Sequence, residues 1–316
     1  MRAGEDIGLD RISGKGRQRS INEDGSYNME RKTGKLLGNF NPYHWVITTS
    51  WQNYWAIQLL FFASINIVFA TAYYCIGVEQ LNGIPESGEN PFSLWLHCLF
   101  FSAQSFTTVG YGGIHPIGTF ANFLAILEAF IGLMTFALAT GTLYGRFSKP
   151  ESKIKYSENI LIAPYKDGLS MQLMVANELQ SILMEMEARV ILSWVDNKDN
   201  NSVRNFQQVT LEIDKIALFP TSWVINHPID EESALYGKSI EDIKSQDFEV
   251  FILLKGFDDI FSQTIYSRHS FLSNKFVWGG KFKKPFFVND EGKVIMDLRK
   301  VGEYDSVPIQ EVVKIL

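Results

Sequence analysis

The sequence has no lysine or arginine between Lys35 and Arg146, although the 316-residue chain contains 29 of these residues in all. Basic residues cluster on both sides of this gap, and the gap itself contains Glu79, Glu86 and Glu89. The positive-inside rule for membrane proteins therefore predicts that both flanks, and with them both termini, lie in the cytoplasm. The acidic region within the gap is expected on the outer side of the membrane.

Several signatures of soluble function are also missing. The chain has only two cysteines, Cys75 and Cys98, and both lie in apolar segments, so a disulfide framework is not expected. The five histidines show no metal-ligand spacing, and no GxGxxG motif follows a strand-like run. A net charge of -6 without a basic stripe gives no support for nucleic-acid binding. No nucleophile–base pair or phosphate loop stands out, so we expect neither an enzyme nor a resident cofactor.

What the sequence does contain is two long apolar segments with a short one between them. Residues 56–77 carry no charge and exceed the ~20 residues that span a bilayer. Residues 117–144 form a second long apolar stretch, interrupted only by Glu128. Residues 92–105 are too short to span and fall in the range of re-entrant segments. The alternative is a third, poorly formed span or a soluble core helix. Residues 1–40 are polar, so the first span, rather than a signal peptide, is expected to direct insertion.

The motif Thr108-Val109-Gly110-Tyr111-Gly112 directly follows the short segment. A run of backbone carbonyl groups can replace the water shell of a potassium ion, and the Thr108 hydroxyl adds one more oxygen. The carbonyl groups point to one side only if alternate residues visit positive φ, which glycine does at low cost. Irregular backbone at membrane depth is tolerated where it lines a wet cavity. The order of span, half-span, motif and span therefore predicts a filter that binds K⁺ as the permeant ion.

From about residue 151 the pattern becomes that of a β domain. Ile182, Met184 and Met186 alternate with Leu183 and Glu185, which is typical of a half-buried strand. An Asn-Asp-Glu-Gly turn at residues 289–292 predicts a hairpin. Many short strands favour an all-β sandwich. Further strand-like runs cover residues 159–163, 208–219, 250–254 and 275–278.

Six sequence blocks, which occur in the same order, carry a family resemblance. They are NEDGSYNMERKTG, NPYHWVITTSW, FFSAQSFTTVGYGGIHPIG, ALATGTLYGRFSKP, HPIDEESALYG and RHSFLSNKFVWGGKF. With them the chain resembles the bacterial inward-rectifier (Kir-type, KirBac) potassium channels over residues 22–316. The resemblance implies a homotetramer in the cell membrane, with four filters around one pore and a cytoplasmic vestibule of immunoglobulin-like β-sandwich domains.

The resemblance also implies a domain order. Residues 1–40 would form a partly disordered cytoplasmic segment, and residues 41–51 an interfacial slide helix. Residues 52–148 would form the transmembrane pore domain, with two spanning helices and a re-entrant pore helix. Residues 149–316 would form the β-sandwich domain.

Phe136, Thr140 and Tyr144 fall at i, i+4 and i+8, on one face of the second span. The resemblance implies that this face lines the pore, with Tyr144 at the helix-bundle crossing, where four rings could close the pore. Tyr144 could instead be an ordinary interfacial aromatic residue. Gly132 and Gly141 fit either flex points of the helix or sites of close packing.

Arg146, Lys149, Lys153 and Lys155 follow the end of the second span. Such clusters attract anionic lipid headgroups by about 1 kcal/mol per charge, and the resemblance implies lipid regulation at this place. The same charges would also be needed simply to set the topology.

Two departures from the family's pattern bear on function. Animal members rectify strongly with an inner-helix acid and vestibule acids, but the matching positions here are Phe136 and Lys255, with Asp214 as a remaining acid. We therefore expect weak rectification. Gln104 and Ile114 replace a Glu–Arg pair that flanks the filter in many members.

Glu128 is the one carboxylate within a predicted span. An acid at membrane depth is a candidate functional residue. We expect it to hydrogen-bond behind the filter rather than to bind ions.

Three functions therefore compete. The leading one is a potassium-selective tetrameric channel whose partners are the membrane and anionic lipid headgroups. The second is a poorly selective cation channel, which the intact TVGYG motif disfavours. The third is a membrane-anchored sensor with a vestigial pore. The intact motif disfavours it, because a protein that conducts no ions does not need two glycines at positive φ there.

Overall fold

The computed structural model describes residues 22, 26, 41–85, 90–148, 153–166, 168–198 and 201–309. The chain forms two compact units, one of Thr33–Lys149 and the other of Met1–Lys32 with Pro150–Leu316. Apart from residues 22 and 26, the predicted partly disordered segment of residues 1–40 lies outside the described residues.

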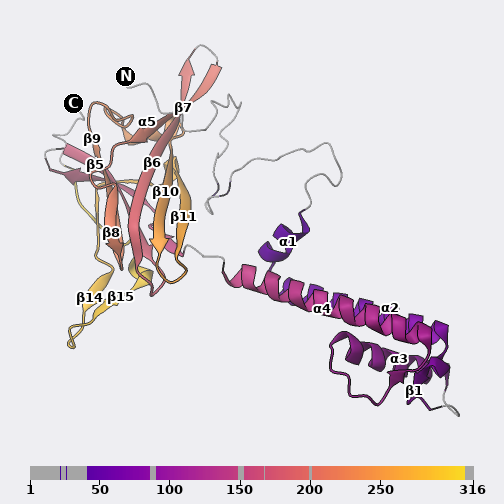
Figure 1. The fold of residues 1–316 in the computed structure, drawn as a ribbon. Coiled ribbons are helices and arrows are strands. Elements are labelled where there is room, and N and C mark those ends of the chain that lie inside the picture. Colours follow the sequence, from indigo (N-terminus) through magenta and orange to yellow (C-terminus); the bar gives the residue numbers. More distant parts are fainter. Residues whose placement is uncertain are drawn as a thin grey trace. The chain divides into compact units, whose positions relative to one another are not determined.

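Four helices build the first unit: α1 (Pro42–Thr48), α2 (Trp51–Ile76), α3 (Pro91–Phe106) and α4 (Thr119–Phe147) (Figure 1). By length and composition α2 and α4 are able to cross a membrane. The 16 residues of α3 extend only about 24 Å, less than the ~30 Å hydrocarbon core. The Asn90 side chain caps α3 by accepting from the Ser93 N–H at 2.8 Å, and Pro91 occupies the first turn. The chain thus folds α3 back between the two long helices.

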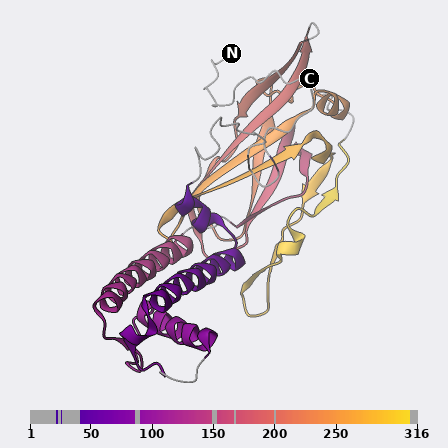
Figure 2. The same ribbon diagram turned by 90° about the vertical axis from the view of Figure 1, so that its right-hand side faces the viewer.

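Helix α3 packs against both α2 and α4, as the turned view shows (Figure 2). Beyond α2 the chain runs through the short helix η1 (Val78–Gln80) into β1 (Leu81–Asn82), which pairs with β2 (His115–Pro116) on the far side of the TVGYG motif. The buried core of this unit lies among the three helices and this ladder. It consists of Phe69, Ala70, Tyr73, Leu81, Ile84, Cys98, Phe101 and Ala121.

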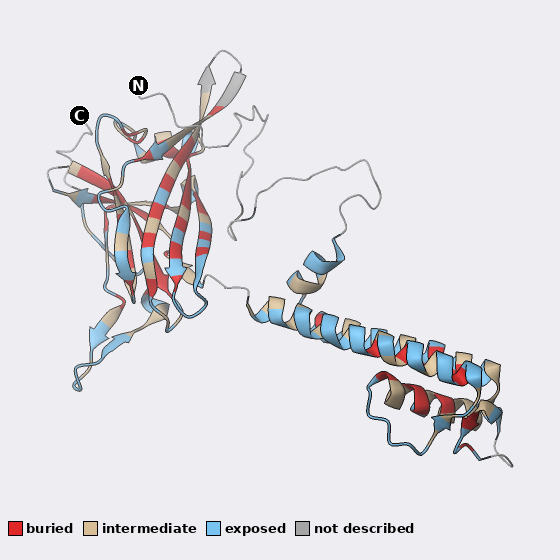
Figure 3. Ribbon diagram, in the orientation of Figure 1, coloured by how far each residue is buried: buried red, intermediate tan, exposed pale blue. Residues whose placement is uncertain are grey.

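The outward faces of α2 and α4 are apolar as well, and Figure 3 shows much of α4 as exposed. Leu60 and Phe123 are typical, with 68% and 69% of their surface accessible. A contiguous apolar surface of this size fits lipid or neighbouring subunits rather than water. The unit is therefore built as a membrane protein.

The second unit is a sandwich of two five-stranded sheets. One sheet has the order β11-β10-β6-β7 with β8 also paired to β6, and the other has the order β12-β4-β5-β3 with β9 also paired to β5. Their strands are β3 (Ile154–Tyr156), β4 (Ile160–Tyr165), β5 (Gly168–Asn177), β6 (Leu183–Lys198), β7 (Asn201–Val209), β8 (Lys215–Phe219), β9 (Ser222–Ile229), β10 (Glu249–Asp258), β11 (Gln263–Leu272) and β12 (Phe276–Trp278).

Smaller elements complete the unit. Helix α5 (Ile240–Ser245) precedes β10, and the short helices η2 (Ser273–Lys275) and η3 (Leu298–Lys300) lie near the C-terminus. Two-stranded sheets join β13 (Gly280–Phe282) to β16 (Tyr304–Ser306) and β14 (Phe286–Val288) to β15 (Val294–Met296). The β14–β15 pair is the predicted hairpin, and its Gly292 has φ 77°.

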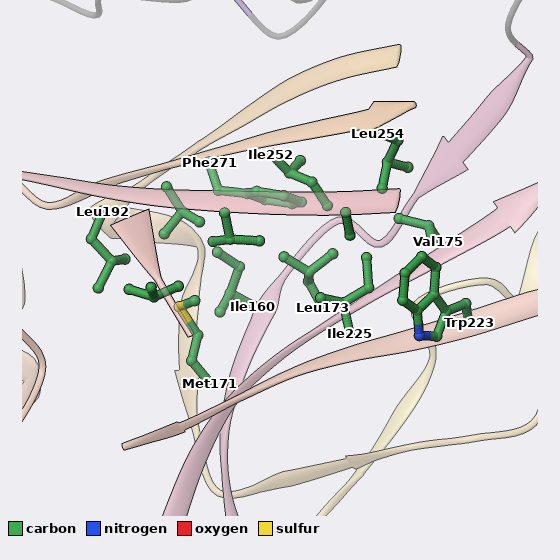
Figure 4. Close-up of a cluster of buried hydrophobic side chains, with 14 of the residues drawn as sticks. Ile160, Met171, Leu173, Val175, Leu192, Trp223, Ile225, Ile252, Leu254 and Phe271 are labelled. Atoms are coloured by element: carbon green, nitrogen blue, oxygen red, sulfur yellow. The ribbon is translucent and has the colours of Figure 1, made fainter. Parts of the chain in front are cut away.

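The side chains between the two sheets form one apolar core, which includes Met171, Leu173, Leu192, Ile225, Ile252 and Phe271 (Figure 4). Alternate residues along each strand contribute to it, as expected for two packed sheets. The prediction of an immunoglobulin-like β-sandwich is thus confirmed.

The alternation predicted for β6 holds only in part. Met186, Ala188 and Val190 are buried, but upstream it is Leu183, not Ile182, that enters the core. Glu185 has φ 49°, and the pairing of β6 with β10 shifts register at this point. A β-bulge adds one residue to a strand, so the two faces exchange. The prediction that Ile182 shares the buried face is therefore wrong.

The run predicted at residues 208–219 is also not one strand. It divides into β7 and β8, which pair with successive parts of the same edge of β6. In the break, the Glu212 N–H donates to the Asn226 carbonyl of β9 at 3.0 Å. The backbone leaves one sheet here to contact the other, which an apolar pattern cannot indicate.

The buried His227 of β9 makes the stability of this unit dependent on pH. Its Nδ1 lies 2.8 Å from the Thr210 carbonyl oxygen and its Nε2 lies 2.8 Å from Ser233 Oγ, so the neutral ring satisfies both contacts. Burial lowers the pKa of His227 below its ordinary value of 6.5, although Thr210 and then Asp230 oppose the shift. Near and below the ordinary value, His227 therefore binds a proton more readily in the unfolded chain than in the folded chain. The free energy of unfolding decreases as the pH drops below that value.

When the pH is lowered from about 7.5 to about 5.5, we expect the denaturant concentration at the unfolding midpoint of the protein in detergent to decrease. His227→Gln keeps a polar side chain but cannot titrate, so its midpoint should fall less over the same interval. Denaturant unfolding followed by tryptophan fluorescence measures both. An equal fall in the two proteins would contradict the role of His227.

Candidate functional site

The TVGYG segment alternates in backbone conformation. Thr108, Gly110 and Gly112 have φ of 59°, 54° and 80°, while Val109 and Tyr111 between them do not have positive φ. This is the alternation that turns successive carbonyl groups to one side. The sequence predicted it at the two glycines but not at Thr108, because a β-branched residue is rare in this region.

The inner end of the segment is tied to the last turn of α3. The Thr108 N–H donates to the Ser105 carbonyl at 3.0 Å, and the Val109 N–H donates to the Gln104 carbonyl at 3.0 Å. Two N–H groups of the segment therefore donate to carbonyl groups of α3. The position of α3 therefore sets the position of the filter carbonyl groups.

Within one chain the filter side chains lack packing partners. Tyr111 is 81% exposed and Val109 is 54% exposed. The Tyr111 ring is therefore not packed against α3 in the described residues.

Phe136, Thr140 and Tyr144 lie together on an exposed face of α4, and Phe136 and Tyr144 are 72% and 74% exposed. The Thr140 hydroxyl donates to the Phe136 carbonyl at 2.9 Å. The three residues predicted to line the pore thus share one exposed face of α4 in the described part of this unit.

The two glycines of α4 differ in their surroundings. A Cβ atom placed on Gly132 would overlap the Phe106 carbonyl group at the end of α3, whereas one placed on Gly141 would meet nothing within 4 Å. Of the two interpretations offered for Gly132, close packing is the one its surroundings favour.

A fully buried polar cluster lies beside the pore helix, one turn before Gly132 along α4. Glu128 lies at its centre, with Ser102 of α3 and Tyr73 and Asn66 of α2 around it. The sequence singled out Glu128 but not its three partners, since isolated polar residues in apolar helices give no sign of which helix they face.

The two residues that replace the family's Glu–Arg pair have other contacts. The backbone carbonyl of Gln104 accepts from the Val109 N–H, and Ile114 packs against the apolar core of this unit.

Arg146, one of the predicted lipid contacts, is engaged within its own unit. Its guanidinium group donates to the Val46 and Thr49 carbonyl groups at 2.6 Å and 2.8 Å, at the end of α1. It also lies over the Trp51 and Tyr54 rings, 4.4 Å and 4.8 Å from their centres. This arginine thus joins the end of α4 to α1 and to the start of α2.

The other three predicted lipid contacts lie elsewhere. Lys149 is outside the described residues, and Lys153 and Lys155 belong to the second unit. The four basic residues are therefore not described as one cluster.

The two residues predicted for the vestibule lie in a charge-balanced region of the β unit. Lys255 of β10 is paired in register with Glu187 of β6, and Lys215 lines the same shallow pocket. Arg189 first, and then Lys215 and Lys255, hold the pKa of Glu187 below its ordinary value. Asp214 is exposed nearby, and its carbonyl group accepts from the Ala188 N–H. Glu187 therefore lies among basic side chains.

Both units match known protein families. The family described as "Inward rectifier potassium channel C-terminal domain" matches residues 154–314, and the family described as "Ion channel" matches residues 59–149. The chain is 30% identical over 287 residues to "Inward rectifier potassium channel Kirbac3.1" of Paramagnetospirillum magnetotacticum, which covers 90% of this chain and 95% of that protein.

Animal proteins are similar at lower identity. "ATP-sensitive inward rectifier potassium channel 12" of Bos taurus is 23% identical over 301 residues, covering 89% of this chain and 70% of that protein. "Inward rectifier potassium channel 4" of Homo sapiens is 23% identical over 279 residues, covering 77% and 62%. The chain belongs to the inward rectifier potassium channel family, a family of membrane ion channels and not of enzymes.

Proposed function

We propose that four copies of this chain form a potassium-selective channel in the cell membrane, with both termini in the cytoplasm. K⁺ binds to stacked rings of oxygen atoms from Thr108, Val109, Gly110 and Tyr111, and Gly112 completes the filter. The observation that carries the proposal is the alternation of positive φ at Thr108, Gly110 and Gly112 in a loop between a half-span and a span. Carbonyl groups turned to one side in this way can exchange a hydration shell for protein oxygens.

A homotetramer is supported by what one chain leaves exposed. Tyr111 and the face with Phe136, Thr140 and Tyr144 are exposed in the described part of the chain. Four copies around one axis would turn that face of α4 toward the pore and give Tyr111 a neighbouring pore helix. Rings of Tyr144 would then form the gate, closing the inner end by steric contact and dewetting.

Anionic lipid headgroups are proposed to act on the lysines that follow α4. Each exposed cation near the surface attracts such headgroups by about 1 kcal/mol. The candidate contacts are Arg146, whose guanidinium group also donates to backbone carbonyls of α1, and Lys149, Lys153 and Lys155, which follow it in sequence.

Rectification is expected to be weak. Phe136 offers no carboxylate to hold magnesium or spermine in the inner helix, and Lys255 lies opposite Glu187 in the β unit. Patch recordings with and without internal magnesium or spermine should show little voltage-dependent block. Phe136→Asp places four acids on the predicted pore face and should create such block. Steep block of the unaltered channel would contradict the proposal.

Rubidium uptake into liposomes tests the proposed function. Uptake that barium blocks, that excess sodium does not compete with and that Tyr111→Asp alters would support a selective pore. Equal uptake of sodium and rubidium would support the poorly selective channel instead. If there is no uptake, Tyr144→Ala separates a closed channel, which this variant opens, from a vestigial pore, which it does not.

A further inference from the structure

The buried cluster beside the pore helix has a hydrogen-bond pattern that needs one more proton than its residues carry at neutral pH. Tyr73 is fully buried and donates from its hydroxyl to Glu128 Oε2 at 2.7 Å. Ser102 Oγ lies 2.5 Å from Glu128 Oε1 and 3.0 Å from Asn66 Oδ1. Asn66 Nδ2 donates to the Phe62 carbonyl at 2.7 Å, which fixes the amide so that its oxygen faces Ser102.

Ser102 Oγ lies within hydrogen-bond distance of three oxygen acceptors, because the Asn66 backbone carbonyl is also 3.3 Å away, but it has only one hydrogen to give. The Asn66 carbonyl can accept from the backbone of α2, whereas Glu128 Oε1 and Asn66 Oδ1 depend on side-chain donors. If Glu128 were ionised, Ser102 could satisfy either Glu128 Oε1 or Asn66 Oδ1, and the other would remain without a donor. Glu128, Ser102 and Asn66 have 0%, 0% and 2% of their surface exposed, so the solvent outside the protein does not reach them. A buried acceptor left unmatched is costly.

A proton on Glu128 Oε1 resolves the pattern. The acid then donates to Ser102 Oγ, Ser102 donates to Asn66 Oδ1, and Tyr73 donates to the carbonyl oxygen Oε2. Every donor in the chain of contacts has one acceptor, and each acceptor has a donor. Tyr73 is the titratable side chain that is hydrogen-bonded to Glu128, and it is a neutral donor in this arrangement. The helices around Glu128 also carry Tyr54, Tyr74, Cys75, His97, Cys98, Tyr144 and Arg146.

The surrounding charges point the same way. No lysine or arginine occurs between Lys35 and Arg146, so neither this chain nor another copy can bring a cation from that stretch to Glu128. Arg146 itself is held at the other end of α4 by carbonyl groups of α1. An ionised carboxylate at this depth would therefore be buried without a counter-charge, which membrane proteins avoid.

We propose that Glu128 is a neutral carboxylic acid that donates to Ser102 and so positions the pore helix behind the filter. Ser102 is two residues before Gln104, whose carbonyl group accepts from the Val109 N–H at 3.0 Å. A displacement of α3 is thus passed to the filter within a single turn of helix. Glu128 is a positioning residue and does not touch the ion. The positioning role rests on the proposed potassium filter, whereas the protonation state does not.

Infrared spectroscopy of the purified protein at neutral pH tests the protonation state without any ion flux. A protonated carboxylic acid has a carbonyl stretch that an ionised carboxylate lacks. We expect such a band, its loss in Glu128→Gln and its retention in Glu79→Gln, a control at an exposed acid of the outer region. Absence of the band in the unaltered protein, or its retention in Glu128→Gln, would overturn the proposal.

A second variant keeps the test sharp if Glu128→Gln fails to assemble. Ser102→Ala removes the acceptor of the proposed hydrogen bond but leaves the acid in place, so the band should shift. An unshifted band would overturn the contact between Glu128 and Ser102.

Rubidium uptake tests the positioning role. Gln is the isostere of the neutral acid and can donate to Ser102, so Glu128→Gln should keep uptake within about twofold, whereas Glu128→Leu should lower it by about tenfold or more. If Glu128→Gln lost as much uptake as Glu128→Leu, the positioning role would be wrong. If neither the wild-type protein nor any variant took up rubidium, the proposed filter function would be contradicted. The infrared band would still report the protonation state of Glu128.

Discussion

Gly110→Ala should abolish rubidium uptake, lowering it by at least about a hundredfold. Gly110 has φ 54°, and nothing lies within 4 Å of where its Cβ would be in one chain, so the effect comes from backbone conformation rather than from a clash in that chain. An L-residue in this region costs roughly 1–2 kcal/mol, and four copies meet in one ring. The carbonyl groups should relax away from the shared orientation, which removes a ring of oxygen ligands from the pore.

Gly113→Ala is the matched control for this prediction. Gly113 is close in sequence, does not have positive φ, and also has nothing within 4 Å of an added Cβ. The same substitution without backbone strain should leave uptake within about twofold of wild type. Wild-type uptake and selectivity in Gly110→Ala would show that the alternating backbone is not what binds the ion.

Arg146→Ala should release α1 from the end of α4. The guanidinium group donates to the Val46, Ile47 and Thr49 carbonyl groups and lies over the Trp51 ring. Each hydrogen bond to a charged group contributes about 1.5–3 kcal/mol, and a cation–π contact adds about 0.5–2 kcal/mol. We expect hydrogen exchange of the α1 amides to accelerate by at least about tenfold and the thermal midpoint of the protein to fall.

Arg146→Lys separates this role from a simple attraction to lipid. Lysine keeps the positive charge near the headgroups but is a compact donor that cannot reach three carbonyl groups and an aromatic face together. Its exchange rates should therefore resemble those of Arg146→Ala more than those of wild type. If Arg146→Lys behaved as wild type in anionic liposomes, charge alone would suffice and α1 would not depend on the hydrogen bonds.

The parts of the fold that could be predicted from sequence are those governed by apolar pattern. The lengths of the apolar segments predict the two long helices and the short helix between them. The alternation of Met186, Ala188 and Val190 predicts which side chains of β6 enter the core of the sandwich. The bulge at Glu185 could not be predicted, since one inserted residue exchanges the faces of a strand without changing its composition.

At the site, the motif predicted the two glycines at positive φ but not Thr108, whose conformation is imposed by its bond to the Ser105 carbonyl and by its neighbours. The partners of Glu128 come from two other helices, and only packing brings them together. From its position beside a membrane span, Arg146 is predicted to contact lipid or to set the topology, and neither interpretation indicates a contact with α1. Its carbonyl partners lie about a hundred positions away in sequence, at the end of α1.

The most direct test of a potassium-selective pore is the reversal potential of the purified protein in a planar bilayer with potassium on one side and sodium on the other. A selective filter predicts a reversal potential far from zero, toward the equilibrium potential of potassium, and its collapse toward zero in Tyr111→Asp. A wild-type current that reverses near zero would contradict the account, because the ring of filter carbonyl groups would then not distinguish potassium from sodium.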